Sequence, residues 1–170
     1  MTRFGWVMTT CFAVLSGSIS ALFHPAPKLL WNASASVPIG LYAVHHVGAL
    51  YVGELLVVTP PEPLASFLDQ RRYLPKSVPL VKRVAALPGQ TVCRTDQAII
   101  VDGFAIGAAL GRDHLGRLLP VWQGCRLIAA GEVFLMNRRS RDSLDGRYFG
   151  PLPSTTIVGR ADPLWTHEKD

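Results

Sequence analysis

Short apolar runs separated by turn residues make up most of the chain after residue 28, a pattern that predicts strands rather than long helices. The expected strands cover residues 41–46, 55–59, 79–85, 91–94, 98–101, 126–128, 133–136 and 157–161. Asp102-Gly103 stands between two apolar runs and is typical of a tight hairpin turn. A short helix is expected at 62–72, and the Gly-rich residues 104–122 predict a loop within a variable flap near 94–124. These elements predict a mainly β fold with a coiled or barrel-like sheet.

The start of the chain follows a different pattern. Residues 4–23 form a run of twenty residues without a charge. A helix of that length measures about 30 Å, the thickness of a bilayer core. The run is long for a signal-peptide core, so we expect residues 1–28 to form a retained membrane anchor or uncleaved signal, with a cleaved signal peptide and a buried core helix as alternatives. Arg3 favours a cytoplasmic N-terminus, which assigns the domain at 29–170 to the opposite side.

The charge balance bears on the choice of partners. The formal net charge is +5, which suits an anionic membrane surface. The densest basic clusters, at 71–72 and 138–141, lack the interleaved aromatic residues of a nucleic-acid platform. We therefore expect a membrane and protein substrates as partners, and no nucleic acid.

The three cysteines differ in their surroundings. Cys11 lies in the N-terminal apolar run and is expected to act there as a small packing residue. Cys93 and Cys125 bracket a 31-residue segment of the outward domain, where an oxidising compartment permits a disulfide. No Cys-x-x-Cys or Cys/His spacing indicates zinc, so no metal and no cofactor is expected.

The most informative polar residue lies inside an apolar run. Lys82 stands between Val81 and Val84 in a segment that should form a buried strand. On a strand Lys82 and Arg83 face opposite ways, so Arg83 can stay solvated while Lys82 is removed from water. Burial lowers the pKa of a lysine, and a neutral amine is a base that can activate a serine. The alternative is a lysine that snorkels to the surface.

A candidate nucleophile lies upstream, in Ser34-Ala35-Ser36-Val37-Pro38-Ile39-Gly40. Pro38 and Gly40 constrain a bend from which Ser36 can project its hydroxyl group. Ser34 lies two residues earlier and points the same way in an extended stretch. It can donate to an oxyanion or be the nucleophile itself, and spacing does not decide between these roles. An ordinary loop serine is the alternative for both.

The strand expected at 133–136 leads into a highly polar loop that runs to residue 151. Such loops on a rigid scaffold often carry function. Ser143 is suited to orient an amine by a hydrogen bond, and Asp145 and Arg147 to pair and hold the loop in shape. The alternative is a solvated, salt-bridged turn.

Three ordered blocks resemble the type I signal peptidase family over residues 32–165. They are Ser-Val-Pro-Ile-Gly-Leu-Tyr at 36–42, Lys-Arg-Val-Ala-Ala-Leu-Pro-Gly at 82–89 and Ser-Leu-Asp-Gly-Arg-Tyr-Phe-Gly-Pro at 143–151. The stretches at 32–38 and 162–165 are most similar to the conjugative-transfer branch, the TraF-type peptidases. The chain departs from the general family at Met136-Asn137-Arg138, where Met-Gly-Asp-Asn-Arg is common, and at Gly146, where serine is usual.

The resemblance implies a membrane-anchored serine endopeptidase that needs neither cofactor nor metal. Ser36 would attack the scissile carbonyl, and uncharged Lys82 would take its proton. Ser34 and the Ser36 amide would stabilise the oxyanion, Ser143 would orient Lys82, and Asp145 would structure the loop or assist the base.

The resemblance also implies a substrate and a place. The substrate would be an exported pilin precursor of the conjugative transfer apparatus, cut after small residues, with water or the pilin's own amine as acceptor. The enzyme would sit in the bacterial inner membrane as a single-pass protein with its catalytic domain in the periplasm. The alternatives are a general type I signal peptidase and a catalytically silent β-domain that binds pilin or scaffolds a secretion channel.

Overall fold

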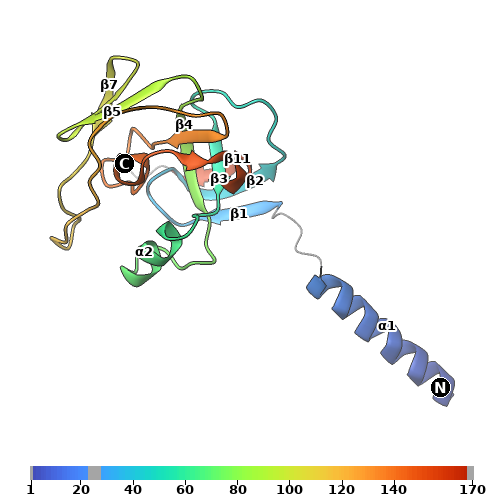
Figure 1. Cartoon of the computed structure of the whole chain (residues 1–170). Coiled ribbons are helices and arrows are strands. Elements are labelled where there is room, and N and C mark those ends of the chain that lie inside the picture. The colour runs from blue at the N-terminus through green and yellow to red at the C-terminus, as the bar shows by residue number, and fades with distance from the viewer. Residues whose placement is uncertain (1, 23–27, 168–170) are drawn as a thin grey trace.

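The protein is built mainly from two β-sheets (Figure 1). The computed structural model describes residues 2–22 and 28–167. The mainly β fold expected from the sequence is confirmed. The predicted strands are present with limits shifted by two residues or fewer, except the last, which continues to His167.

The larger sheet has seven strands in the order β1-β2-β11-β3-β4-β9-β10, and all neighbouring pairs are antiparallel. These strands are β1 (Leu29–Asn32), β2 (Ile39–His45), β3 (Leu55–Val58), β4 (Leu80–Ala86), β9 (Glu132–Leu135), β10 (Leu152–Pro153) and β11 (Ile157–His167). The long β11 pairs with both β2 and β3 and so joins the two halves of the sheet. The serine loop between β1 and β2 and the lysine on β4 therefore belong to one sheet.

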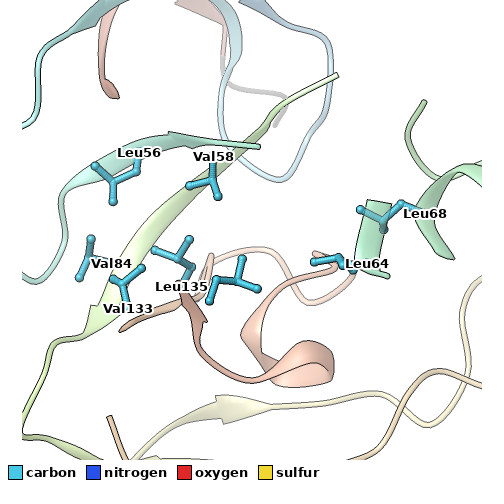
Figure 2. Packing of buried hydrophobic residues seen from close by; sticks show 8 residues of the cluster. Leu56, Val58, Leu64, Leu68, Val84, Val133 and Leu135 are labelled. Atoms are coloured by element: carbon cyan, nitrogen blue, oxygen red, sulfur yellow. The ribbon is translucent and has the colours of Figure 1, made fainter. Parts of the chain in front are cut away.

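A hydrophobic core fixes the strands around β4. Its buried side chains come from β3, β4, β9, β10 and the helix α2 (Leu64–Gln70). Figure 2 shows them together: Leu56, Val58, Val84, Val133, Leu135, Leu64 and Leu68. Each side chain of this size contributes roughly 1.5–3 kcal/mol when it is fully buried. The strand that carries Lys82 is therefore held between two well-packed neighbours.

The smaller sheet has four strands in the order β7-β6-β5-β8. They are β5 (Thr91–Thr95), β6 (Ala98–Val101), β7 (Phe104–Ala108) and β8 (Gly124–Leu127). Asp102 and Gly103 have positive φ angles of 47° and 84°, as the predicted hairpin turn requires. The expected disulfide is present and joins Cys93 on β5 to Cys125 on β8. The flap is more regular than its glycine content predicted, because β7 pairs with β6.

The N-terminal apolar run forms the predicted helix, α1 (Arg3–Leu22), but its expected role as an anchor is not supported. Its side chains at Trp6 and Phe12 are exposed, which rules out a buried core helix. Thr9 and Thr10 interrupt the apolar run with hydroxyl groups that donate to backbone oxygens one turn earlier. Among the residues that the structure describes, no helix combines the length and hydropathy needed to span a membrane.

Several short elements were not predicted from the sequence, and one predicted helix is shorter than expected. The helix expected at 62–72 is present as the shorter α2, which follows its N-cap residue Pro63. The single-turn helix α3 (Gly146–Phe149), the 3₁₀ turn η1 (Ser154–Thr156) and the strands β1 and β10 were not predicted. Elements of two to four residues are too short to show a hydrophobic period. α3 is defined instead by a local cap, because the Asp145 side chain accepts a hydrogen bond from Arg147 N.

Candidate active site

The loop between β1 and β2 presents the two serines singled out from the sequence. Ser34 is exposed and Ser36 is half-buried. Ser34 Oγ donates to Ser36 Oγ at 3.2 Å, and Ser36 N donates to Ser34 Oγ at 3.3 Å. The two hydroxyl groups therefore meet, but within a turn at residues 35–36 rather than along the extended stretch expected from the sequence.

Asn32, at the end of β1, holds this serine loop in place. Its buried side chain donates from Nδ2 to the carbonyl oxygens of Ser34 at 2.8 Å and Pro38 at 3.0 Å. Its Oδ1 accepts a hydrogen bond from Ser34 N at 3.1 Å. Sequence reasoning missed this role, although asparagine is well known to bond its own backbone two residues on.

Lys82 lies in the middle of β4, opposite Leu56 of β3. Only 4% of its surface is exposed, whereas the neighbouring Arg83 is exposed. Its Nζ donates to Ser143 Oγ at 2.8 Å. Burial lowers the pKa of Lys82 to about 8, with a smaller lowering from the Arg147 charge, while the Asp145 charge acts in the opposite direction. The buried lysine predicted from the apolar run is thus present.

The loop after β9 is shaped by a buried ion pair. Arg147 Nη2 lies 2.8 Å from Asp145 Oδ2, and both side chains are almost fully buried. Arg147 also donates from Nη2 to Ser140 O at 2.6 Å, and Asp145 Oδ2 accepts from Asn137 N at 3.0 Å. The pairing of Asp145 and Arg147 predicted from sequence is therefore present, and it ties both ends of the loop that carries Ser143.

Asn137 is a second residue that sequence reasoning noticed only as a departure from a motif. Its Nδ2 donates to Val81 O at 3.1 Å, and its Oδ1 accepts from Arg83 N at 2.9 Å. These bonds clasp the backbone on both sides of Lys82. Asn137 therefore fixes β4 to the loop at the point where the lysine leaves the strand.

One cavity brings the predicted residues together. It has a volume of about 640 Å³, and its lining includes Ser34, Ser36, Lys82 and Ser143. Within the described ranges, no hydrogen bond joins Ser36 to Lys82; the lysine is bound to Ser143 and Ser36 to Ser34. A hydroxyl, an amine that titrates near pH 8 and a hydroxyl that orients the amine are the groups needed to activate a serine.

Among the described residues, no group of three or more His, Cys, Asp or Glu side chains is placed so that it could hold a metal ion.

Comparison with known proteins adds family context to this site. The model of the signal peptidase family, peptidase S26, matches residues 1–165. The conjugal transfer protein TraF of Agrobacterium fabrum (strain C58 / ATCC 33970) is 33% identical over 149 aligned positions, and the match covers 81% of this chain and 82% of that protein. The plasmid transfer protein TraF of Escherichia coli is 32% identical over 171 aligned positions, and the match covers 92% of this chain and 96% of that protein. A crystal structure of a signal peptidase I from Enterococcus faecalis V583 aligns with a TM-score of 0.41 and 17% identity, covering 67% of this chain and 97% of that one.

Proposed function

The chain belongs to the signal peptidase family, peptidase S26, and from this premise we propose that it is a serine endopeptidase that processes pilin precursors. The names of the TraF relatives, which refer to conjugal and plasmid transfer, support a role in conjugative transfer. The observation that carries the assignment is a buried lysine, Lys82, whose pKa is lowered to about 8 by removal from water, on the wall of a cavity that Ser36 also lines.

In the proposed reaction, the neutral amine of Lys82 accepts the hydroxyl proton of Ser36 while Ser36 Oγ attacks the scissile carbonyl carbon. Lys82 then passes this proton to the departing nitrogen, and the acyl group remains on Ser36 as an ester. A lysine with a pKa of about 8 is half neutral at pH 8, whereas well under 1% of an ordinary lysine is neutral there. The lowered pKa therefore supplies the base.

Substrate binding must rearrange the serines before this reaction. Ser34 Oγ and Ser36 N, the two expected oxyanion donors, are bonded to each other in the free protein. A carbonyl oxygen that enters between them would replace this contact and accept from both. Catalytic hydrogen bonds are often long before substrate binds and tighten in the complex, so the Ser36 to Lys82 contact would form at this stage.

Ser36 is the better candidate for the nucleophile than Ser34. Ser36 lines the cavity of Lys82 and also a second, larger cavity, whereas Ser34 lines only the first. A peptide cut in its interior extends in both directions from the attacked carbonyl. A peptide attacked at Ser36 can therefore place the residues before the bond in one cavity and the residues after it in the other.

The smaller cavity suits the residue that precedes the bond. Its wall next to Lys82 is built from Leu80 and Val81, with Leu110 and Leu119 from the flap. An apolar wall favours uncharged side chains over charged ones. After acylation, either water or an amine of the pilin can attack the ester, giving a linear or a cyclic product.

The disulfide supports an extracytoplasmic site of action. Cys93 and Cys125 are joined in the structure, and disulfides persist in oxidising compartments such as the bacterial periplasm. We therefore propose that the catalytic domain works in the periplasm, where exported pilin precursors become available.

The decisive experiment incubates the full-length protein with a pilin precursor and follows intact mass. Ser36→Ala and Lys82→Ala are each expected to lower kcat/KM by about 10³-fold or more, because each removes one half of the nucleophile–base pair. Loss of a leader or tail reports cleavage, and a further loss of one water from the product reports cyclisation.

Matched controls come from adjacent exposed positions. Ser77→Ala and Lys76→Ala remove the same functional groups outside both cavities and should leave kcat/KM unchanged. Full activity of either Ser36→Ala or Lys82→Ala would contradict the mechanism. A parent protein that binds the precursor without cutting it would instead identify a silent pilin-binding domain.

A further inference from the structure

The second cavity that reaches Ser36 has a strongly positive lining. Its volume is about 1020 Å³, and it is formed largely by the serine loop, β4 and the loop after β9. Its charged lining residues are Arg83, Arg138, Arg139, Arg141 and Asp142. We call it the basic cavity, because its lining includes four arginines and only one acidic residue.

Two of these arginines are held by backbone carbonyl groups rather than by carboxylates. Arg83 Nη1 donates to Gly53 O at 2.9 Å, and Arg138 Nε donates to Ile106 O at 3.1 Å. Both carbonyl groups belong to residues that line the same cavity. In the described part of the chain, neither arginine lies in an ion pair with a carboxylate. A carbonyl oxygen fixes the position of a guanidinium group but leaves its full charge to act on a ligand.

Asp142 weakens this positive field but does not reverse it. Its side chain is exposed and lines both cavities, next to Ser143 in the sequence. The four arginines are exposed as well, so they carry their charge at no desolvation cost. A concave surface lined by an excess of one charge concentrates ligands of the opposite charge.

We propose that the basic cavity binds an acidic segment of the substrate that directly follows the scissile bond. This inference rests on the proposed function, in which the residue before the bond enters the smaller, apolar-walled cavity. A chain attacked at Ser36 continues past the bond, and the basic cavity also reaches this serine. Arginine binds carboxylates through paired hydrogen bonds, so aspartate, glutamate or the terminal carboxylate of a short tail matches its lining.

The test compares four peptides that share one cleavage site. Two carry Glu or Gln at the second and third positions after the bond, and two carry the same exchange before it. The parent is expected to cleave the peptide with Glu after the bond about tenfold faster, by kcat/KM, than its Gln counterpart. This ratio should fall to about twofold or less in R138Q/R141Q, and it should shrink in the parent as salt is raised from 0.05 to 0.5 M.

The Glu-to-Gln ratio is measured within one protein preparation, so it does not depend on the folded fraction of a variant. Arg72→Gln is the matched control, because this exposed arginine lines neither cavity, and it should keep the parental ratio. Equal cleavage of the two peptides by the parent would overturn the inference and leave the peptidase assignment intact. A preference for Glu before the bond, or one that survives R138Q/R141Q, would also overturn it.

A binding measurement separates this inference from the chemistry. In the Ser36→Ala background, the fluorescently labelled peptide with Glu after the bond should bind about tenfold more tightly than its Gln counterpart, and R138Q/R141Q should remove the difference. Such binding without cleavage by the parent would overturn the peptidase and keep an acidic-peptide site. Neither binding nor cleavage would overturn both.

Discussion

The two sheets contribute to the candidate site in different ways. The larger sheet and its loops hold every side chain proposed for the chemistry: Ser36 follows β1, Lys82 lies on β4, and Ser143 follows β9. The smaller sheet holds none of them but braces the loop after β9, because Arg94 on β5 donates from Nη1 to Arg147 O at 2.7 Å. One sheet carries the proposed reacting groups, and the other supports the loop that holds Ser143.

The sheets also differ in how they are held together. All four residues of β3 in the larger sheet are buried, whereas all four residues of β8 and four of five in β7 are exposed. The smaller sheet buries Val92, Ile99 and Val101 in a second core cluster, and the disulfide between Cys93 and Cys125 adds a covalent cross-link between β5 and β8. The exposed edge strand β8 is therefore held by a covalent bond as well as by backbone pairing.

The largest effect is expected where the larger sheet depends on a buried charge pair. Arg147→Met leaves the Asp145 carboxylate buried without its partner and removes the bonds that shape the loop. Breaking such a pair costs about 3–5 kcal/mol, so the midpoint of urea unfolding should fall sharply and cleavage should be lost. Arg126→Met is the control, since its ion pair with Glu132 is half exposed and removing it should cost less than about 1 kcal/mol. Equal stability of the two variants would contradict the assigned role of the Asp145–Arg147 pair.

A smaller effect, on stability alone, is expected in the other sheet. Replacing both Cys93 and Cys125 with alanine removes a cross-link between positions 32 residues apart in the sequence. The free energy of urea unfolding should fall by about 2–4 kcal/mol. Under conditions where this variant is folded, kcat/KM should stay within about twofold of the parent, because no reacting group lies on this sheet. Cys11→Ala, which exchanges a free cysteine and breaks no disulfide, serves as the control. A folded variant as inactive as Lys82→Ala would show that the smaller sheet does more than brace the loop.

Local sequence patterns predicted the features that depend on neighbours in the chain. The alternation of a strand predicted that Lys82 and Arg83 face opposite ways, and in the structure Lys82 is buried while Arg83 is exposed. The Asp102-Gly103 turn was equally local, and its positive φ angles follow from the types of these two residues. The meeting of Ser36, Lys82 and Ser143 in one cavity was predicted only through the order of three family motifs.

Features that depend on long-range contacts were not predicted. Asn137 forms hydrogen bonds with the backbone on both sides of Lys82, more than fifty residues earlier in the chain. No local sequence pattern predicts such a long-range bond. The basic cavity likewise needs Arg83 and the arginines after β9 to meet through the pairing of β4 with β9. The expected membrane anchor is not supported, because no helix among the described residues reaches the mean hydropathy of a span, which the length of an uncharged run does not measure.

The central claim is that burial lowers the pKa of Lys82 enough to leave its amine about half neutral near pH 8. A direct titration of the Lys82 side chain tests this claim. The ¹³Cε signal of Lys82, identified by its absence in Lys82→Met, can be followed against pH in folded Ser36→Ala protein. The predicted midpoint is about 8, against about 10.4 for the same lysine in urea-unfolded protein. Since only the neutral amine accepts a proton, kcat/KM of the parent should rise with pH through the same midpoint and then level off. A midpoint near 10.4 in the folded protein would contradict the account.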